Sequence, residues 1–234
     1  MTHRFFVDDD PAPGALLRGA QAHQIANVLR LSPGEEIAVV RDGFESIVVL
    51  DAVSPSEVRG HVTERRSLDT ELRVALTLAL PILRGDRTEE VIEAVTQLGV
   101  SRIVPYVSSR SVVRALGPAK RERWARVARE SAETARRGRI PTIDDCRDWV
   151  ALFDALGPGA LVAWEGERER GLADAVPQGP LALVIGPEGG LDVTEVALAR
   201  AHGAVTVSLG PRNLRSETAA IAAVAQLVGR LDRT

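Results

Sequence analysis

The sequence predicts an α/β protein in two parts: a small β-barrel over residues 1–70, then a parallel sheet with helices on both faces over residues 71–234. Three observations lead to this prediction. The first part consists of short strand-like runs joined by tight turns. The second part opens on a largely apolar run, Leu72–Leu80, which is typical of a strand buried on both faces. From that run onward, strand-like and helix-like segments alternate, which is the pattern of a parallel sheet.

In the first part we expect four strands around one helix. The helix is predicted over Ala20–Leu31, where apolar residues recur at helical spacing until Ser32-Pro33-Gly34 ends the pattern. The pair Asp42-Gly43, between two strand-like runs, is a strong signal for a β-hairpin. The expected strands are Arg4–Val7, Glu36–Arg41, Ser46–Val53 and Val58–Arg65.

In the second part, capping residues indicate where helices begin and end. Asp86 stands at an expected N-cap, and Glu89 follows at capping-box spacing. Gly99 is expected to end that helix. A long helix is predicted over Pro118–Arg137, with Trp124 on its apolar face. The other expected elements are strands Ile103–Val107, Ala160–Trp164, Leu181–Ile185 and Val205–Leu209, and helices Val193–His202 and Glu217–Leu231.

The composition excludes several classes of protein. Hydrophobic residues make up 45% of the 234 residues and charged residues 26%, which is ordinary for a globular protein. No apolar run reaches the roughly 18 residues of a membrane span, and the acidic start does not resemble a signal peptide. The single cysteine, Cys146, excludes a disulfide framework, and the four histidines lack metal-ligand spacing. We therefore expect a cytoplasmic location, no membrane and no metal.

The basic residues are unevenly distributed along the chain. Lys120 is the single lysine among 29 basic residues, and no P-loop motif surrounds it, so P-loop nucleotide chemistry is excluded. Residues 110–139 carry ten basic and three acidic residues, a local charge of +7, although the whole chain has a net charge of −3. This stretch fits RNA phosphates, and it also fits the solvated face of a helix in an arginine-rich chain. Both interpretations stay open at this point.

Two polar loops follow predicted strands and carry the strongest functional signal. They are Ile185–Asp192 and Leu209–Thr218, and a Gly-Pro pair lies near the start of each. Open α/β sheets bind ligands at the carboxyl ends of their strands, and glycines let a ligand approach the backbone closely. Neither a dinucleotide-binding glycine motif nor a hydrolase nucleophile motif is present. The residues thus predict a small-molecule site made mostly of backbone, beside Glu188, Glu217, Arg212 and Arg215.

These two loops resemble the signature motifs of the RsmE family, the 16S ribosomal RNA (uracil-N3)-methyltransferases of the SPOUT superfamily. The first motif is Gly186-Pro-Glu-Gly-Gly and the second is Leu209-Gly-Pro-Arg-x-Leu-Arg-x-Glu-Thr-Ala. The resemblance covers nearly the whole chain. It extends to Arg4-Phe-Phe-Val, His23–Leu31, Thr96–Pro105 and Ser109-Arg-Ser-Val-Val.

The resemblance implies a fold and an activity. Residues 1–70 would form a PUA-like RNA-binding barrel, and residues 71–234 a SPOUT domain with a deep trefoil knot that binds S-adenosylmethionine. The protein would be a homodimer without a metal and would methylate N3 of one uridine in 16S rRNA of the small ribosomal subunit. The alternatives are a SPOUT methyltransferase acting on another RNA and a noncatalytic RNA-binding assembly factor.

The resemblance also implies roles for individual residues. By position, Glu188 or Glu217 would remove the N3 proton; alternatively, Arg212 and Arg215 would stabilise negative charge on the uracil carbonyls. The implied cofactor residues are Ile185, Gly186, Pro187, Glu188, Gly189, Gly190, Leu209, Gly210, Leu214, Arg215 and Thr218. The arginines expected to meet RNA phosphates are Arg4, Arg18, Arg30, Arg84, Arg87, Arg136 and Arg139.

Overall fold

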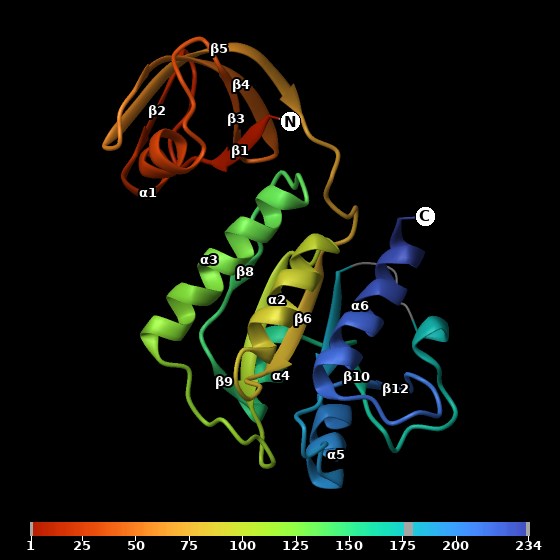
Figure 1. Cartoon of the computed structure of the whole chain (residues 1–234). Helices are drawn as coiled ribbons and strands as arrows, with labels where there is room; N and C mark the ends of the chain where they lie inside the picture. The colour runs from red at the N-terminus through yellow and green to blue at the C-terminus, as the bar shows by residue number, and fades with distance from the viewer. Residues whose placement is uncertain (1, 176–179, 233–234) are drawn as a thin grey trace. The chain divides into compact units, whose positions relative to one another are not determined.

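The computed structural model describes residues 2–175 and 180–232 (Figure 1). The chain divides into two compact units. The N-terminal unit comprises Met1–Glu71 together with Ala132–Arg139, and the C-terminal unit comprises Leu72–Ser131 and Ile140–Thr234.

The N-terminal unit is a curled five-stranded sheet, with strand order β1-β3-β4-β5-β2 (Figure 1). Its first pair, β1–β3, is parallel, and the other pairs are antiparallel. Two register shifts lie in β4, between Ile47 and Val48 and between Leu50 and Ala52, and such bulges increase the bend of a sheet. The strands are β1 His3–Phe6, β2 Gly14–Arg18, β3 Glu36–Arg41, β4 Phe44–Val53 and β5 Glu57–Ser67.

The β-hairpin expected at Asp42-Gly43 is confirmed. Arg41 pairs with Phe44, so the connecting loop has two residues. Asp42 has φ +50° and Gly43 φ +82°, and positive φ at both positions is the signature of a type I′ turn. The turn matches the right-handed twist of the strands that it joins, which is why this short signal can be read from the sequence.

The single helix expected over Ala20–Leu31 is wrong in its form. The chain forms a short α-helix, α1 (Gly19–His23), and then a π-helix, η1 (Gln24–Val28). The wider turn is seen where the Leu29 N–H donates to the Gln24 carbonyl at 2.9 Å, five residues back. The strand β2 was not expected either, because its five residues, Gly14–Arg18, are too short a run to be distinctive.

The C-terminal unit is a seven-stranded sheet in which every pair is parallel, with the path β12-β10-β11-β6-β7-β8 and β9 also paired to β7. Its strands are β6 Leu76–Pro81, β7 Arg102–Val107, β8 Thr142–Ile143, β9 Arg147–Asp148, β10 Leu161–Ala163, β11 Leu181–Ile185 and β12 Val205–Val207. Its helices are α2 Arg87–Gln97, α3 Pro118–Thr134, α4 Trp149–Leu156, η2 Leu172–Asp174, α5 Val193–Ala201 and α6 Ser216–Leu231. The last turn of α3 belongs to the N-terminal unit.

Helices cover both faces of this sheet, as the alternating pattern predicts. On β6, Leu78 and Leu80 belong to the core shared with α2, α3 and α6, whereas Ala79 belongs to the core shared with α4 and α5. Successive residues of a strand point to opposite faces, so a strand between two helix layers is apolar at every position. This is the physical reason for the largely apolar run in the sequence, although the strand begins only at Leu76 and not at Leu72.

The structure corrects several element ends. Asp86 makes no side-chain cap for α2; it lies 3.3 Å from Arg123 instead. Asp192 does form a capping box with Glu195 at the start of α5. The helix α3 ends at Thr134, because Arg136 adopts a left-handed φ of +56°. Within the described residues, no helix is long and apolar enough to cross a membrane.

Candidate functional site

A cavity of about 670 Å³ lies at the carboxyl edge of the parallel sheet, where β10, β11 and β12 end. These strands are neighbours, because β10 lies between β12 and β11. Their three loops therefore meet at one place, although they are far apart in the sequence. The lining comes from residues 163–165 and 168, residues 185–190 and residues 208–216, with Arg87 of α2 and Ala219 of α6.

Both predicted loops line this cavity. Of the eleven implied cofactor residues, Thr218 alone is absent from the lining; it is exposed on α6. The others are Ile185, Gly186, Pro187, Glu188, Gly189, Gly190, Leu209, Gly210, Leu214 and Arg215. The catalytic candidates Glu188, Arg212 and Arg215 also line the cavity, whereas Glu217 does not.

The first loop is a tight turn that depends on glycine at two places. The Gly190 N–H donates to the Pro187 carbonyl at 2.9 Å, and Gly190 has φ +72°, which favours glycine. A Cβ at Gly190 would lie 2.5 Å from Glu165 Oε1, and a Cβ at Gly189 would lie 3.0 Å from the Cβ of Arg110. The loop therefore runs between a side chain of the neighbouring loop and the segment that follows β7.

The second loop leads into α6 and is tied to the first. The Ser216 hydroxyl, in the first turn of α6, donates to the Gly186 carbonyl at 2.8 Å. Arg215 occupies the N-cap position and makes no side-chain cap. The N-terminus of α6 thus lies at the cavity, where its backbone N–H groups and dipole favour negative charge.

Similarity to known proteins shows the family to which a chain with this site belongs. A family model described as RNA methyltransferase domain matches residues 70–228. The ribosomal RNA small subunit methyltransferase E of Bacillus subtilis is 33% identical, over 96% of this chain and 95% of that protein. The chain belongs to the ribosomal RNA small subunit methyltransferase E family. This makes it an RNA methyltransferase.

Two further relatives agree with this assignment. The methyltransferase E of Mycobacterium tuberculosis is 33% identical, over 97% of this chain and 93% of that protein. The crystal structure of a methyltransferase E from Neisseria gonorrhoeae bound to S-adenosyl methionine superposes with a TM-score of 0.89 at 28% identity, covering 98% of both chains.

The methyltransferase has a third cavity loop, Trp164–Arg168, that the sequence analysis missed. Trp164, Glu165 and Arg168 all line the cavity. The loop has no Gly-Pro signature, and only the position of β10 between β11 and β12 brings it to the site. A usable signal was the polar run directly after the predicted strand Ala160–Trp164, since a strand end next to two site loops is itself a candidate.

Glu167 fixes the shape of this third loop. Its carboxylate accepts the Thr206 hydroxyl at 2.6 Å and the backbone N–H groups of Arg168, Glu169 and Arg170 at 3.0, 2.9 and 3.3 Å. These hydrogen bonds stabilise the ionised form, the Thr206 hydroxyl most of all, and lower the pKa of Glu167 to about 2. The ionised carboxylate therefore acts as an anchor for the backbone that carries Glu165.

The two candidate bases have different surroundings. One carboxylate oxygen of Glu188 accepts the backbone N–H of Arg84 at 3.2 Å, and Glu188 is one of the residues that line the cavity. Glu217 lies 3.7 Å from Arg87 Nε, and its Oε2 is buried without a hydrogen bond from any described residue. Glu188 is therefore part of the cavity lining, whereas the carboxylate of Glu217 lies beside Arg87.

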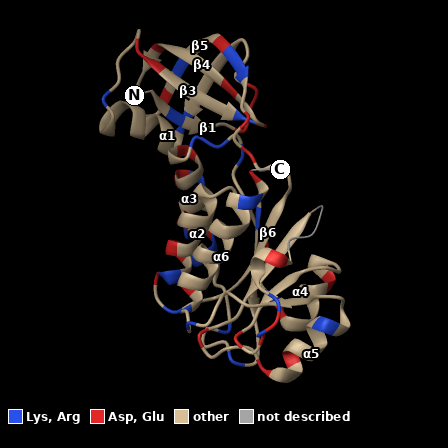
Figure 2. Cartoon of the chain, turned by 90° about the vertical axis from the view of Figure 1, so that its right-hand side faces the viewer, with Lys and Arg blue, Asp and Glu red and all other residues tan. Residues whose placement is uncertain are grey.

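The arginines expected to meet RNA lie in both units, where basic and acidic residues are interspersed along the ribbon (Figure 2). In the N-terminal unit, Arg4 is buried beside Glu45 at 3.5 Å, and its side chain is 7% exposed. Arg18 pairs with Glu57 at 3.0 Å. Of the arginines expected to meet RNA in this unit, Arg18, Arg30, Arg136 and Arg139 are exposed.

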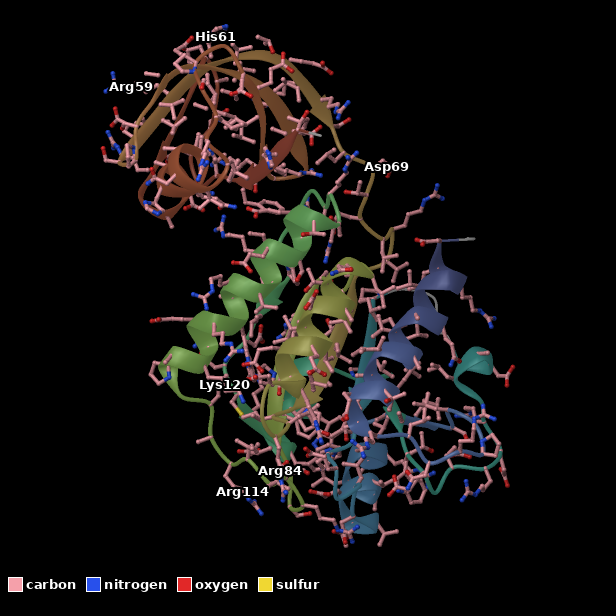
Figure 3. The ribbon with its side chains drawn as sticks, viewed as in Figure 1. Arg59, His61, Asp69, Arg84, Arg114 and Lys120 are labelled. Carbon is pink, nitrogen blue, oxygen red and sulfur yellow. The ribbon has the colours of Figure 1, made fainter. Side chains whose placement is uncertain are left out.

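In the C-terminal unit, Arg84 is exposed in the loop after β6 (Figure 3), and Arg87 lines the cavity. The loop that carries Arg84 is held in part by Lys120, whose ammonium group donates to the Gly85 carbonyl at 3.3 Å. Among the residues that the structure describes, no group of three or more His, Cys, Asp or Glu side chains is arranged to hold a metal ion.

Proposed function

We propose that this protein binds S-adenosylmethionine in the cavity at the carboxyl edge of its parallel sheet and transfers the methyl group to N3 of one uridine in 16S rRNA of the small ribosomal subunit. The observation that carries the proposal is the meeting of the Gly186–Gly190 loop and the Leu209–Arg215 loop in one cavity. Both loops belong to the motifs on which the family resemblance rests.

The cavity fits the proposed cofactor in size and in chemistry. Its volume of about 670 Å³ lies within the range of small-molecule sites. Ile185, Leu209 and Leu214 offer apolar surface for an adenine ring, and the loop backbone offers N–H and C=O groups for its polar edge. Glu165 provides a carboxylate for a cationic or hydroxyl group, and the N-terminus of α6 favours a carboxylate.

The chain's own residues then have distinct tasks. When bound, the cofactor supplies a methyl group on a sulfonium centre, so the protein mainly aligns the reactants, which can contribute about 7–11 kcal/mol. Uracil N3 must lose its proton before it attacks well. Glu188 is the proposed acceptor of that proton, since it lines the cavity and Glu217 does not. Glu217 is proposed to orient Arg87, which lies 3.7 Å from it.

Positive charge at the cavity supports the same assignment. Arg212 and Arg215 are among its lining residues. Guanidinium groups placed in this way stabilise negative charge that develops on the uracil carbonyl oxygens as N3 loses its proton.

The rest of the chain is proposed to recognise the RNA. The curled sheet of the N-terminal unit supports a PUA-like barrel, and Arg18, Arg30, Arg136 and Arg139 offer exposed charge there. In the C-terminal unit Arg84 offers exposed charge, and Arg87 is half-buried at the cavity. We leave Arg4 out of the proposed RNA surface because it is buried. A trefoil knot, a homodimer and a cytoplasmic location complete the proposal, and the family resemblance supports them.

The deciding experiment is methyl transfer from labelled S-adenosylmethionine to small ribosomal subunits that lack the modification, with free 16S rRNA in parallel and the modified base mapped. Label at N3 of one uridine is the expected result. Label on another RNA would move the substrate but keep the reaction. Tight cofactor binding with no label on any RNA would favour a noncatalytic assembly factor.

A further inference from the structure

The strand that leads into the first cavity loop, β11, ends on a residue whose carbonyl group lacks a backbone hydrogen-bond donor in the neighbouring strand β6. The Leu181 N–H of β11 donates to the Ala75 carbonyl at 3.0 Å, and the register then runs from Leu181 opposite Leu76 to Val184 opposite Ala79. Parallel strands repeat their hydrogen bonds every two residues, and both backbone groups of one residue point to the same neighbour. By this register, the Ile185 carbonyl faces the backbone nitrogen of residue 81.

Residue 81 is a proline and has no N–H to donate. Pro81 is the last residue of β6 and is buried, and Ile185 is buried directly before Gly186. The ladder between β6 and β11 therefore cannot supply a donor to the last carbonyl of β11. An unpaired carbonyl in such a place is costly, because water does not reach it.

Tyr106 supplies the missing donor from the next strand. Its hydroxyl donates to the Ile185 carbonyl at 2.5 Å, across β6, opposite Pro81 in the register of β7. The side chain is fully buried, and its ring packs 5.4 Å from the ring of Trp149. Burial, together with the negative charge of Glu195, raises the pKa of Tyr106 well above its usual value, so the hydroxyl keeps its proton.

The chain that follows Tyr106 holds the far end of the same loop. The Ser109 N–H donates to Glu195 Oε1 at 2.7 Å, and Glu195 Oε2 accepts the Asp192 N–H at 2.9 Å. The guanidinium of Arg110 donates to Asp192 Oδ2 at 2.8 Å and to the Gly189 carbonyl at 3.4 Å. The short segment from Tyr106, near the end of β7, to Arg110 thus holds both ends of the loop that lines the cavity.

We propose that Tyr106 is a positioning residue for the cofactor site: its hydroxyl replaces the donor that Pro81 lacks and fixes the Ile185 carbonyl from which the Gly186–Gly190 loop begins. The inference rests on the proposed function, in which that loop holds S-adenosylmethionine. It goes further by assigning a role to a side chain that does not line the cavity.

The test is Tyr106→Phe, which keeps the buried ring and removes the hydroxyl. Calorimetric titration with S-adenosylhomocysteine is expected to show a dissociation constant about tenfold higher, equal to about 1.4 kcal/mol. Amide exchange over residues 186–190 is expected to accelerate. The matched control is Ser101→Ala, which removes a hydroxyl that donates to the Leu76 carbonyl at 3.1 Å, at the opposite edge of the sheet. The control is expected to change neither quantity.

A rescue variant separates positioning from general packing. Pro81→Ala restores a backbone N–H opposite the Ile185 carbonyl, so the double variant Tyr106→Phe with Pro81→Ala is expected to recover most of the affinity. Pro81→Ala alone provides the reference for the small loss of packing. A Tyr106→Phe protein that melts earlier but binds as tightly as the unchanged protein, with unchanged loop exchange, would overturn the proposal.

The two proposals can fail separately. If the unchanged protein does not bind S-adenosylhomocysteine, the proposed cofactor site is wrong, and loop exchange alone decides the role of Tyr106. If the unchanged protein binds and Tyr106→Phe alters neither affinity nor exchange, the cofactor site stands and the positioning role is wrong.

Discussion

The two edges of the parallel sheet in the C-terminal unit are held together by different groups. At the amino ends of β10 and β12, backbone bonds to backbone: the Val205 N–H donates to the Ala160 carbonyl and the Gly159 N–H to the Gly203 carbonyl. At the carboxyl edge, side chains hold the loops: Ser216 binds the Gly186 carbonyl, Tyr106 binds the Ile185 carbonyl, and Glu167 binds three successive N–H groups.

This difference shows how a backbone-lined site can be rigid. Where side chains bind some backbone groups of a loop, the loop is held in place while its other backbone N–H and C=O groups can face the cavity and bind a ligand. Substitutions at the carboxyl edge should therefore change binding and catalysis, whereas similar substitutions at the amino edge should change stability alone.

The largest effect is expected from Glu188→Gln. Loss of the proposed proton acceptor should lower kcat for methyl transfer by about 10²–10⁴-fold, while cofactor affinity changes little. The comparison variant is Glu217→Gln, which changes a neighbouring carboxylate that does not line the cavity. Single-turnover assays on small ribosomal subunits measure both. Equal losses in the two variants would contradict the assignment of Glu188 as acceptor.

A pair of glycines tests the two edges directly. Gly190 at the carboxyl edge and Gly203 at the amino edge both have positive φ, +72° and +82°. Alanine at either position should cost about 1–2 kcal/mol of unfolding free energy, because an L-residue is strained there. Gly190→Ala should in addition weaken cofactor binding about ten- to hundredfold, since its methyl group displaces Glu165.

Denaturation curves and calorimetric titration distinguish these two consequences. If Gly203→Ala weakened cofactor binding as much as Gly190→Ala, the difference between the two edges would not hold.

A smaller effect is expected from Glu165→Gln. The variant keeps the size of the side chain in the cavity and removes its charge. A charge-assisted hydrogen bond to the cofactor would be lost, so the dissociation constant should rise about tenfold. Titration with S-adenosylhomocysteine measures the change. An unchanged affinity would mean that the third loop shapes the cavity without contacting the cofactor.

The smallest effect concerns acid stability through Glu167. The pKa of Glu167 is lowered from 4.5 to about 2 in the folded protein. Folding therefore stabilises the ionised carboxylate relative to the protonated form. The resulting stabilisation is present above pH 4.5 and is lost as the pH falls toward about 2. Glu167→Gln should therefore be less stable near neutral pH, and its deficit should shrink as the solution is acidified. Urea denaturation at several pH values measures this, and a deficit independent of pH would contradict it.

Local signals in the sequence were reliable for features that short segments decide by themselves. The Asp42-Gly43 turn depends on two residues and their own backbone, and it appears as expected. The cap expected at Asp86 does not form; its side chain lies 3.3 Å from Arg123 of α3 instead. The switch of α1 into a π-helix at Gln24 has no local signal in the sequence; Ala22 and Ile25, on either side of the switch, are buried in the core of the sheet. Local propensity does not report such packing.

The sequence by itself determined the parallel α/β architecture and the two glycine-rich loops, because buried strands and turns can be recognised from residues that are adjacent in the chain. Only the tertiary structure decided which groups meet. It placed β10 between β11 and β12 and so brought Glu165 to the cavity, and it put Glu188 but not Glu217 in the cavity lining. It also set Tyr106 across β6 from Ile185. Strand order and register are fixed by contacts between distant segments, and no short pattern in the chain contains them.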